Sequence, residues 1–290
     1  MNPEVSIVII NYNKVNLTID CIDSIYQKTK GVNFEIILVD NASTEGDVKI
    51  AKEKFPCVDF IMSKENLGFA KGNNLGIAQA KADTILLLNN DTVLINDAIS
   101  LAYKKLKAQP EAGVVAAQLQ YPDGRIQHNA SSLPSLKKIL LALFRIDRFI
   151  SKQKRARMYL GFLFDHRYEV IAEWIWGAFF MIKKEVIEKL PEKKMPDDLF
   201  MYSEDIEWGY AVKQTGYKII FFPEAKLIHY VGQSNYSKTA QAIKKNTKYI
   251  IAKYRGKLFA TIYLFFYKLY HVSMGIEYRL TGKKMNTQQD

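Results

Sequence analysis

Amide and carboxylate side chains follow a short aliphatic segment of this sequence. Residues 85–88 are Ile-Leu-Leu-Leu, and Asn89, Asn90 and Asp91 come directly after them. A buried strand of an open α/β sheet presents ligands at its carboxyl end, where a carboxylate can bind a hard divalent cation. The motif therefore indicates a ligand site that holds one carboxylate and two amides.

Two other apolar segments end in side chains of the same kind. Residues 5–10 lead into Asn11 and Asn13, and residues 35–39 lead into Asp40. A carboxylate beside amides suits the imide N–H of uracil or thymine, because that group needs a hydrogen-bond acceptor. The alternative is that Asp40 caps the helix that follows.

A further polar segment contains small residues. Asn66, Gly68 and Asn73 belong to a predicted loop that runs into a helix. Small side chains let a ligand approach the backbone, and the amino end of a helix favours phosphate. The spacing matches neither the dinucleotide-binding glycine motif nor the P-loop, so an ordinary polar turn is the alternative.

These segments need a scaffold that brings them to one edge, and the first 120 residues predict one. Short apolar runs alternate with amphipathic stretches, which is typical of parallel βαβ units. The predicted strands cover residues 5–10, 35–39, 59–62, 84–88 and 114–117, and the predicted helices cover residues 17–27, 48–55, 69–79 and 97–107. We therefore predict an α/β fold with a Rossmann-like, mostly parallel central sheet and helices on both faces.

The pattern changes after residue 120. We predict an amphipathic helix over residues 136–150, strands over 174–182 and 217–222, a helix from Ser203 to Gly216, and a helical tail over 237–280. Ser203 is expected to cap its helix, whose first turn holds Glu204 and Asp205. Cys21 and Cys57 match no metal-binding spacing, so we expect both to be reduced residues of the core.

Taken together, these segments resemble the inverting glycosyltransferases of family 2. The motifs that carry the resemblance occur in the family's order at residues 6–13, 39–43, 66–74, 88–92, 176–181 and 202–207. The resemblance covers about residues 4 to 235 and is closest to the rhamnosyltransferase-like branch. It implies a GT-A catalytic domain over residues 1–235, with a nucleotide-binding half (1–120) and an acceptor-binding half (121–235). Residues 236–290 would form an amphipathic helical extension.

The resemblance also implies roles for individual residues. The nucleotide-diphosphate sugar would contact Asn11, Asn13, Asp40, Asn66, Gly68, Asn73, Asn89 and Asn90. Mg²⁺ or Mn²⁺ would bind Asp91 and His229. An inverting transfer needs one base for the acceptor hydroxyl, which would be Asp205 with support from Glu204. Trp176 and Gly177 would contact the acceptor, because an aromatic face stacks on the apolar face of a sugar.

Each of these assignments has a structural alternative. A lone histidine after a strand is often part of the core, and His229 could be one. Glu204 and Asp205 could only stabilise a helix N-terminus. Trp176 could be an ordinary buried tryptophan. The competing functional class is a non-catalytic relative that binds a nucleotide sugar or a glycan, for which a base at position 205 would have no use.

Positive charge is concentrated in two parts of the chain. The net charge is +11, and residues 236–290 alone contain 11 basic and 2 acidic residues, while a second basic cluster covers residues 137–157. Apolar and aromatic residues lie among these charges, which favours attachment to an anionic membrane surface. The alternatives are that the tail packs on the catalytic domain or on a second subunit, as in a homodimer. No motif that reads nucleic acid is present, so we expect no nucleic-acid partner.

The substrates follow from the resemblance alone. Rhamnose from dTDP-rhamnose is the first expectation for the donor, and a UDP-hexose or UDP-N-acetylhexosamine is the alternative. The acceptor would be a lipid-linked glycan or a polysaccharide of the cell surface. The first residues lead directly into a strand and resemble no signal peptide, so we expect a cytoplasmic protein that is peripheral at the inner face of the cell membrane.

Overall fold

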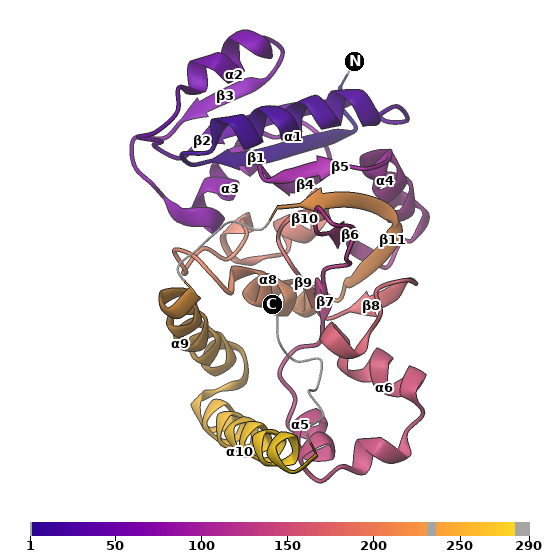
Figure 1. Cartoon of the computed structure of the whole chain (residues 1–290). Helices are drawn as coiled ribbons and strands as arrows, with labels where there is room; N and C mark the ends of the chain where they lie inside the picture. The colour runs from indigo at the N-terminus through magenta and orange to yellow at the C-terminus, as the bar shows by residue number, and fades with distance from the viewer. Residues whose placement is uncertain (1, 231–235, 282–290) are drawn as a thin grey trace.

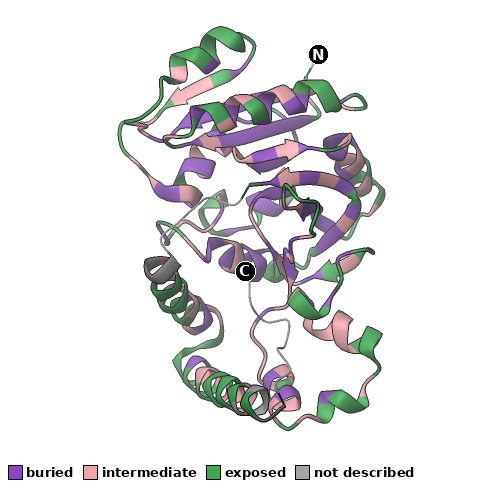
Figure 2. Cartoon of the chain, viewed as in Figure 1, coloured by how far each residue is buried: buried purple, intermediate pink, exposed green. Residues whose placement is uncertain are grey.

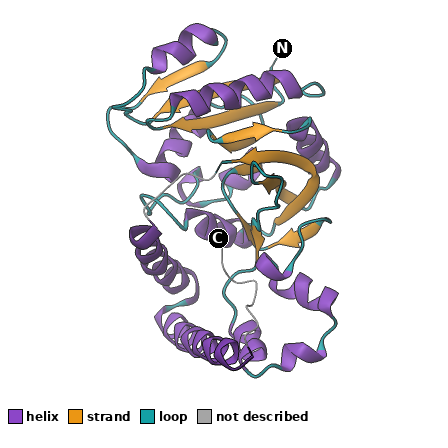
Figure 3. Cartoon of the chain, viewed as in Figure 1, coloured by secondary structure: helices purple, strands orange, loops and turns teal. Residues whose placement is uncertain are grey.

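The computed structural model describes residues 2–230 and 236–281 and shows a single large sheet with helices on both faces (Figures 1 and 3). The sheet has nine strands in the order β3-β2-β1-β4-β10-β6-β11-β5, with β8 paired to β11. The strands are β1 (Val5–Asn11), β2 (Phe34–Asp40), β3 (Asp59–Met62), β4 (Thr84–Asn89), β5 (Thr92–Leu94), β6 (Ala112–Gln120), β8 (Val170–Ala172), β10 (Phe179–Lys183) and β11 (Lys218–His229). A small second sheet joins β7 (Ala130–Ser131) to β9 (Trp174–Ile175).

The first four strands are parallel, and this part of the fold is as predicted. β1 pairs in parallel with β2 and β4, and β2 pairs in parallel with β3. The connecting helices are α1 (Val15–Lys28), α2 (Val48–Lys54), α3 (Gly68–Gln79) and α4 (Ala98–Ala108). Because both faces of the sheet are covered, its central strands are apolar along nearly their whole length rather than alternating. Figure 2 shows these strands as the most buried part of the molecule.

Alternate residues of β1 enter two different cores. Ile7 and Ile9 pack with Cys21, Ile22 and Ile25 of α1 on one face. Val8 points to the other face, which is covered by α3, α7 (Lys184–Glu188) and α8 (Glu204–Gln214). A strand whose side chains alternate between two helical layers is the local reason for the doubly covered sheet.

The second half of the sheet is mixed. β10 runs antiparallel to both β4 and β6, whereas β6 and β11 are parallel. β11 extends from Lys218 to His229, farther than the predicted strand, with an irregularity between Phe222 and Lys226. Such a bulge bends a strand, and here it carries the end of β11 across to β5.

Two predicted elements are interrupted. The helix expected over residues 136–150 ends as α5 (Leu136–Leu143), because Arg145 adopts a left-handed backbone, and a 3₁₀ turn, η1 (Ile146–Phe149), follows. That turn buries Asp147, which interacts with the hydroxyl of Tyr159 in α6 (Lys152–Tyr159). The strand expected over residues 174–182 is divided into β9 and β10, since the chain passes from the small sheet to the large one at Trp176–Ala178.

Two smaller predictions are wrong. Ser203 does not cap α8 with its side chain, because its backbone is left-handed with φ 72°. Cys57 is exposed, since it lies in the turn between α2 and β3, whereas Cys21 is buried as expected.

The tail is helical, as predicted, and part of it packs on α8. It forms α9 (Tyr236–Arg255) and α10 (Lys257–Thr281), which meet at Gly256 with φ +86°. Lys253 of α9 donates to Glu207 of α8 at 2.8 Å, and Tyr254 stacks on Tyr210 with ring centroids 4.9 Å apart. The expected boundary at residue 235 lies outside the described residues.

The contact between α3 and β1 gives a test of the packing. A Cβ added at Gly76 would lie 2.3 Å from Cγ1 of Val8, so Gly76→Ala should overpack the core and destabilise the protein by about 1–3 kcal/mol. The control is Gly275→Ala in α10. An added Cβ there would have no described atom within 4 Å beyond its own stretch of helix, and alanine favours the helix. Urea denaturation should show a loss of stability for the first variant alone; equal midpoints would contradict this packing.

Candidate active site

The register of the sheet brings the first polar residues to one edge. Asn11, the last residue of β1, pairs with Asp40 at the end of β2, and Ile10 pairs with Asn89 at the end of β4. These three strands are parallel, so Asn11, Asp40 and Asn89 all lie at their carboxyl ends. This is the edge at which an open α/β sheet binds ligands.

A hydrogen-bond network holds Asp40 in place. Its Oδ1 accepts from Asn11 Nδ2 at 2.7 Å and from Ser43 Oγ at 2.6 Å, while its Oδ2 accepts from the Ser43 N–H at 3.1 Å. Asp47, not Asp40, caps α2, so the capping alternative for Asp40 is wrong. Asp40 is buried, and Oδ2 keeps one lone pair that a ligand N–H could use.

Thr18 ties α1 to two of the strand ends. Its hydroxyl donates to Asn11 Oδ1 at 2.9 Å and accepts from Asn90 Nδ2 at 3.0 Å.

Asn13 contacts the loop after β2. Its Oδ1 accepts from the N–H groups of Thr44 and Glu45 at 2.7 and 3.0 Å. Ser43 belongs to a motif that sequence reasoning identified, whereas nothing in the local sequence distinguishes Thr18.

The loop before α3 has a conformation that requires glycine. Gly68 has φ +77°, and a Cβ there would lie 2.1 Å from the carbonyl oxygen of Phe200. The backbones therefore meet, and the N–H of Phe69 donates to the Phe200 carbonyl at 3.1 Å. Asn66 Oδ1 accepts from Asn41 Nδ2 and from the Gly68 N–H, each at 3.0 Å. This loop is thus joined to the segment that leads into α8.

Asn73 and Asn89, both expected to contact the sugar donor, differ in how their side chains are hydrogen-bonded. Asn73 is buried within α3 and donates to the carbonyl of Phe69 at 3.0 Å. Oδ1 of Asn89 is buried without a hydrogen-bond partner among the described residues, and the Asn89 N–H donates to the Ala178 carbonyl. Asn89 therefore has an unused acceptor at the sheet edge, while the Asn73 side chain is satisfied inside its helix.

Asp91 and His229 meet where β4 and β11 end. Asp91 Oδ1 lies 3.4 Å from His229 Nε2, and the Tyr230 N–H donates to the Asp91 carbonyl at 2.9 Å. β11 brings His229 opposite Thr92 of β5, which is next to Asp91 in the chain. The expected pair of ligands is thus brought together by strand pairing.

Gln127 sets the orientation of the His229 ring. Gln127 Nε2 donates to the His229 carbonyl at 2.8 Å, so its Oε1, which lies 2.9 Å from His229 Nδ1, accepts the ring N–H. The lone pair of Nε2 then faces the Asp91 carboxylate, and a proton or a metal ion must lie between these two acceptors. No pattern in the sequence pointed to Gln127.

This pair fits a divalent cation of the kind that binds substrate phosphate. No group of three or more His, Cys, Asp or Glu residues is placed to hold a metal within residues 2–230 and 236–281. Mg²⁺ and Mn²⁺ do not need such a cage, because they bind through one or two protein ligands while phosphate oxygens and water complete the octahedron. Asp91 and His229 would supply the two protein ligands.

Trp176 lies beside this pair. Its ring is half-buried against the core, and its edge meets the His229 ring with centroids 6.3 Å apart. A Cβ at Gly177 would lie 3.1 Å from the Phe69 ring, which itself stacks on Trp208 of α8. Trp176 therefore contacts His229, and the adjacent Gly177 packs against Phe69 near Trp208 of α8.

The first turn of α8 carries the acidic pair. Tyr202 and Ser203 have left-handed backbones with φ 71° and 72°, and Asn246 of α9 donates to the Tyr202 carbonyl at 2.8 Å. Asp205 Oδ1 accepts from the N–H of Ile206, and Glu204 Oε2 is buried without a partner among the described residues. Two strained residues that are not glycine cost stability and are often found at functional sites.

Both carboxyl groups bind their protons more tightly than ordinary carboxyl groups do. Burial raises the pKa of Asp205 to about 7. Burial, with the charge of Asp205 as the next cause, raises the pKa of Glu204 to about 8. A carboxylate whose pKa lies near the working pH is suited to accept a proton during a reaction.

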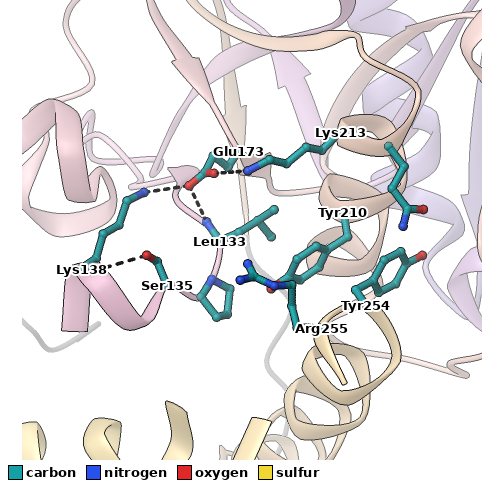
Figure 4. Close-up of a pocket in the computed structure, with 10 residues that line it drawn as sticks. Leu133, Ser135, Lys138, Glu173, Tyr210, Lys213, Tyr254 and Arg255 are labelled. Carbon is teal, nitrogen blue, oxygen red and sulfur yellow. Dashed lines mark hydrogen bonds and ion pairs between the residues drawn. The ribbon is translucent and has the colours of Figure 1, made fainter. Parts of the chain in front are cut away.

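A separate cavity lies along the C-terminal half of α8 (Figure 4). It has a volume of about 310 Å³, and none of Asp40, Asp91 and Asp205 lines it. Within it, Glu173 accepts from Lys138 at 2.8 Å and from Lys213 at 2.7 Å. Burial raises the pKa of Glu173, but these hydrogen bonds outweigh burial and leave the pKa lowered. Glu173 therefore fastens α5 and α8 to the bend between β8 and β9.

The comparisons with known proteins identify the family of the chain. Residues 6–190 match the family described as glycosyl transferase family 2. The chain belongs to glycosyl transferase family 2. The match covers the ends of β1, β2 and β4, the Gly68 loop and Trp176, so the family that the motifs predicted is confirmed.

Relatives of this family 2 chain act in glycan synthesis. It is 21% identical over 215 residues to the N-acetylglucosaminyl-diphospho-decaprenol L-rhamnosyltransferase of Mycobacterium tuberculosis. The match covers 69% of this chain and 67% of that protein. It is 24% identical to the O-antigen biosynthesis protein RfbC of Myxococcus xanthus over 80% of this chain, but it spans only 18% of that protein.

A solved structure confirms the predicted fold. The mannosyltransferase PcManGT from Pyrobaculum calidifontis, in complex with GDP-Man and Mn²⁺, superposes with a TM-score of 0.62. The alignment covers 98% of this chain and 77% of that chain at 17% identity. The family 2 chain thus has a GT-A fold with a mixed, mostly parallel sheet.

The raised pKa values predict how stability depends on pH. Glu204 and Asp205 bind protons more tightly in the folded chain than in the unfolded chain, where their pKa is about 4. The protonated groups therefore contribute to the free energy of unfolding at low pH, and this contribution is lost as pH rises from about 4 to 8. Glu204→Gln removes one charge that burial disfavours. Its melting temperature relative to the unmodified chain should therefore increase by at least ~2 °C between pH 5 and pH 8, which corresponds to ~1 kcal/mol.

The control for this measurement is Glu224→Gln, which changes an exposed carboxylate. Its relative melting temperature should not vary over the same range. A Glu204→Gln difference that is constant or falls with pH would show that Glu204 titrates normally.

Proposed function

We propose that this chain is an inverting glycosyltransferase. It transfers a sugar from a nucleotide-diphosphate donor to a lipid-linked glycan or a polysaccharide of the cell surface. The donor lies along the sheet edge, against Asn11, Asn13, Asp40 and the amides of the Asn89–Asn90 motif. The acceptor approaches from the side of Trp176 and α8.

The observation that carries this proposal is the contact between the Gly68 loop and the segment before α8. The hydrogen bond from Phe69 to Phe200, with Phe69 stacked on Trp208, joins the donor loop to the helix that begins with Glu204 and Asp205. Asp91 and His229 meet beside Trp176, and the adjacent Gly177 packs against the same Phe69 ring. A pair of carboxyl groups with raised pKa values and a pair of possible cation ligands support transfer rather than binding alone.

In this reaction Asp205 is the general base. Its carboxylate takes the proton of the acceptor hydroxyl as the oxygen attacks the anomeric carbon of the donor. The bond from that carbon to the diphosphate oxygen breaks, and the nucleoside diphosphate leaves with the electron pair. Glu204, protonated at neutral pH by its raised pKa, can donate a hydrogen bond to the acceptor or to Asp205.

Asp91 and His229 would hold the cation. A Mg²⁺ or Mn²⁺ ion there would supply positive charge to stabilise the departing diphosphate. Gln127 keeps the lone pair of His229 Nε2 directed at Asp91, as a second layer of ligands does in metal sites.

The donor that we infer is dTDP-rhamnose, with a UDP-hexose or UDP-N-acetylhexosamine as the alternative. The rhamnosyltransferase relative supports the first, and the free lone pair of Asp40 Oδ2 suits the imide N–H of either pyrimidine. An acceptor attached to a lipid carrier would place the chain at the inner face of the cell membrane. The main competing function is a relative that binds a nucleotide sugar without transferring it.

The role of Asp205 can be tested by one substitution. Asp205→Asn should lower kcat by about 10²–10⁴-fold, because a general base is lost, and should leave donor affinity within about twofold. Asp198→Asn is the matched control in the same segment, because Asp198 pairs with Lys253 outside the reaction, and its kcat should stay within about threefold. Full turnover by Asp205→Asn would refute the mechanism; donor binding without turnover in the unmodified chain would favour the non-catalytic function.

The metal site can be tested without a turnover assay. His229→Ala should weaken Mn²⁺ binding in the presence of nucleoside diphosphate by more than tenfold, and Gln127→Leu should weaken it by about 10–100-fold through loss of ring orientation. Mn²⁺ titration followed by electron paramagnetic resonance measures both affinities. Gln120→Leu is the control, since Gln120 donates to Gln118 and not to His229. Unchanged affinity in His229→Ala would remove the metal from this site.

A further inference from the structure

One face of α10 carries an apolar stripe that the protein leaves uncovered. Its members, Leu258, Ile262, Phe265, Leu269 and Val272, are all exposed. Their spacing of four and three residues places them along one side of a helix. Leu258 is 76% exposed and Phe265 is 58% exposed, so this side makes little contact with the rest of the chain.

The opposite side of α10 holds the helix against the protein. Ala260 is buried there, and near the far end Arg145 Nη1 lies 2.9 Å from Met274 Sδ and the Arg145 guanidinium lies over the Tyr270 ring. Figure 1 shows α10 beside α5, and the two helices are in contact. The stripe therefore faces away from the protein, as the exposed outer side of α10 in Figure 2 illustrates.

The turn after α5 adds exposed apolar residues next to α10. Phe144, Ile146 and Phe149 are exposed, and Phe149 is 92% exposed. Arg145, which contacts α10, lies among them in the chain. We call the α10 stripe the apolar face, and these three residues add exposed apolar surface on the neighbouring turn.

Positively charged side chains lie beside the apolar face on α10 and beside Phe149 on η1 and α6. Lys257 and Lys268, both exposed, are eleven residues apart and thus lie along one flank of the stripe. Exposed Arg148, Lys152 and Lys154 follow or adjoin Phe149 in the chain. The only acidic residue between positions 136 and 157 is Asp147, which is buried. The two basic clusters of the sequence thus become neighbours in the fold.

We propose that the apolar face docks on the surface of an anionic lipid bilayer, with α10 lying along the headgroups. This deepens the proposed function, on which its biological meaning rests, by naming the surface that meets the membrane. Apolar side chains enter the boundary of the acyl chains while the lysines stay at the level of the lipid phosphates. No described helix is long and apolar enough to cross a bilayer, which agrees with a helix that lies on it.

The charge of the face favours lipid over a second copy of the chain. In a homodimer through α10 the bordering lysines and arginines of both copies would approach one another, and like charges that face each other are unfavourable. An anionic lipid surface instead pairs with each of them and strengthens binding by about fivefold per charge.

Vesicle binding tests the proposal directly. The full chain should co-sediment with vesicles of phosphatidylglycerol and phosphatidylcholine (1:1), and the double variant Leu258→Glu/Phe265→Glu should bind at least tenfold more weakly. Ile50→Glu is the matched control, because Ile50 is 52% exposed on α2 at the other end of the molecule, and it should bind as the unmodified chain does. Thermal melting confirms that the variants fold.

The contribution of charge is tested by a second pair of variants. Lys257→Ser/Lys268→Ser should lower binding to the anionic vesicles by about 25-fold. Lys49→Ser/Lys52→Ser, which removes two exposed charges from α2, should have little effect. Vesicles of phosphatidylcholine alone should bind every form weakly.

Two outcomes would overturn the proposal. One is that the unmodified chain does not bind anionic vesicles, or that Leu258→Glu/Phe265→Glu binds them as tightly as the unmodified chain does. The other is a dimer in light scattering that the stripe variant converts to a monomer while vesicle binding is unchanged, which would assign the face to a second copy. Stabilisation of the chain by free nucleoside diphosphate and Mn²⁺ needs no membrane, so its failure would count against the proposed function and not against this surface.

Discussion

The hydrogen bond between the Phe69 N–H and the Phe200 carbonyl joins the two halves of the site. It is possible because residue 68 is glycine. The Cβ of any other residue at this position would overlap the Phe200 carbonyl oxygen. The first half of the site comes from parallel strand ends, which are rigid, whereas Glu204 and Asp205 follow an irregular segment. This contact, together with the stacking of Phe69 on Trp208, fixes the position of the acidic pair relative to the sheet edge. Asn246 of α9 holds the same segment from the other side.

The distribution of charge separates residues that hold the fold from residues that can react. Glu173 pairs with Lys138 and Lys213, and Glu207 pairs with Lys253, so these carboxylates fasten helices together. Glu204 is buried and Asp205 is partly buried, neither has an ion pair among the described residues, and their raised pKa values reflect that cost. A protein keeps such destabilising groups where function requires them. The same reasoning applies to Asp91 and His229, whose facing acceptors need a proton or a metal ion between them.

Most of the fold could be predicted from the sequence, because the period of the apolar residues specifies β1 to β4 and their helices. The strand ends could be predicted too, since polar residues follow each apolar run. Gln127, Thr18 and the Phe200 carbonyl could not, because each acts through contacts between segments that are distant in the chain. The breaks at Arg145 and at Trp176–Ala178 were missed for a related reason: tertiary contacts overrode a continuous local pattern. The junction of the basic clusters at α5 and α10 likewise exists only in three dimensions.

The central claim is that Asp91 with His229 and Asp205 act on opposite sides of one donor. A crystal structure with Mn²⁺ and a non-hydrolysable analogue of dTDP-rhamnose, or of a UDP-sugar, tests it most directly. Anomalous diffraction should place manganese about 2.0–2.3 Å from both Asp91 and His229. The Asp205 carboxylate should face the anomeric carbon from the side opposite the diphosphate. Manganese bound elsewhere, or Asp205 on the side of the leaving group, would contradict the account.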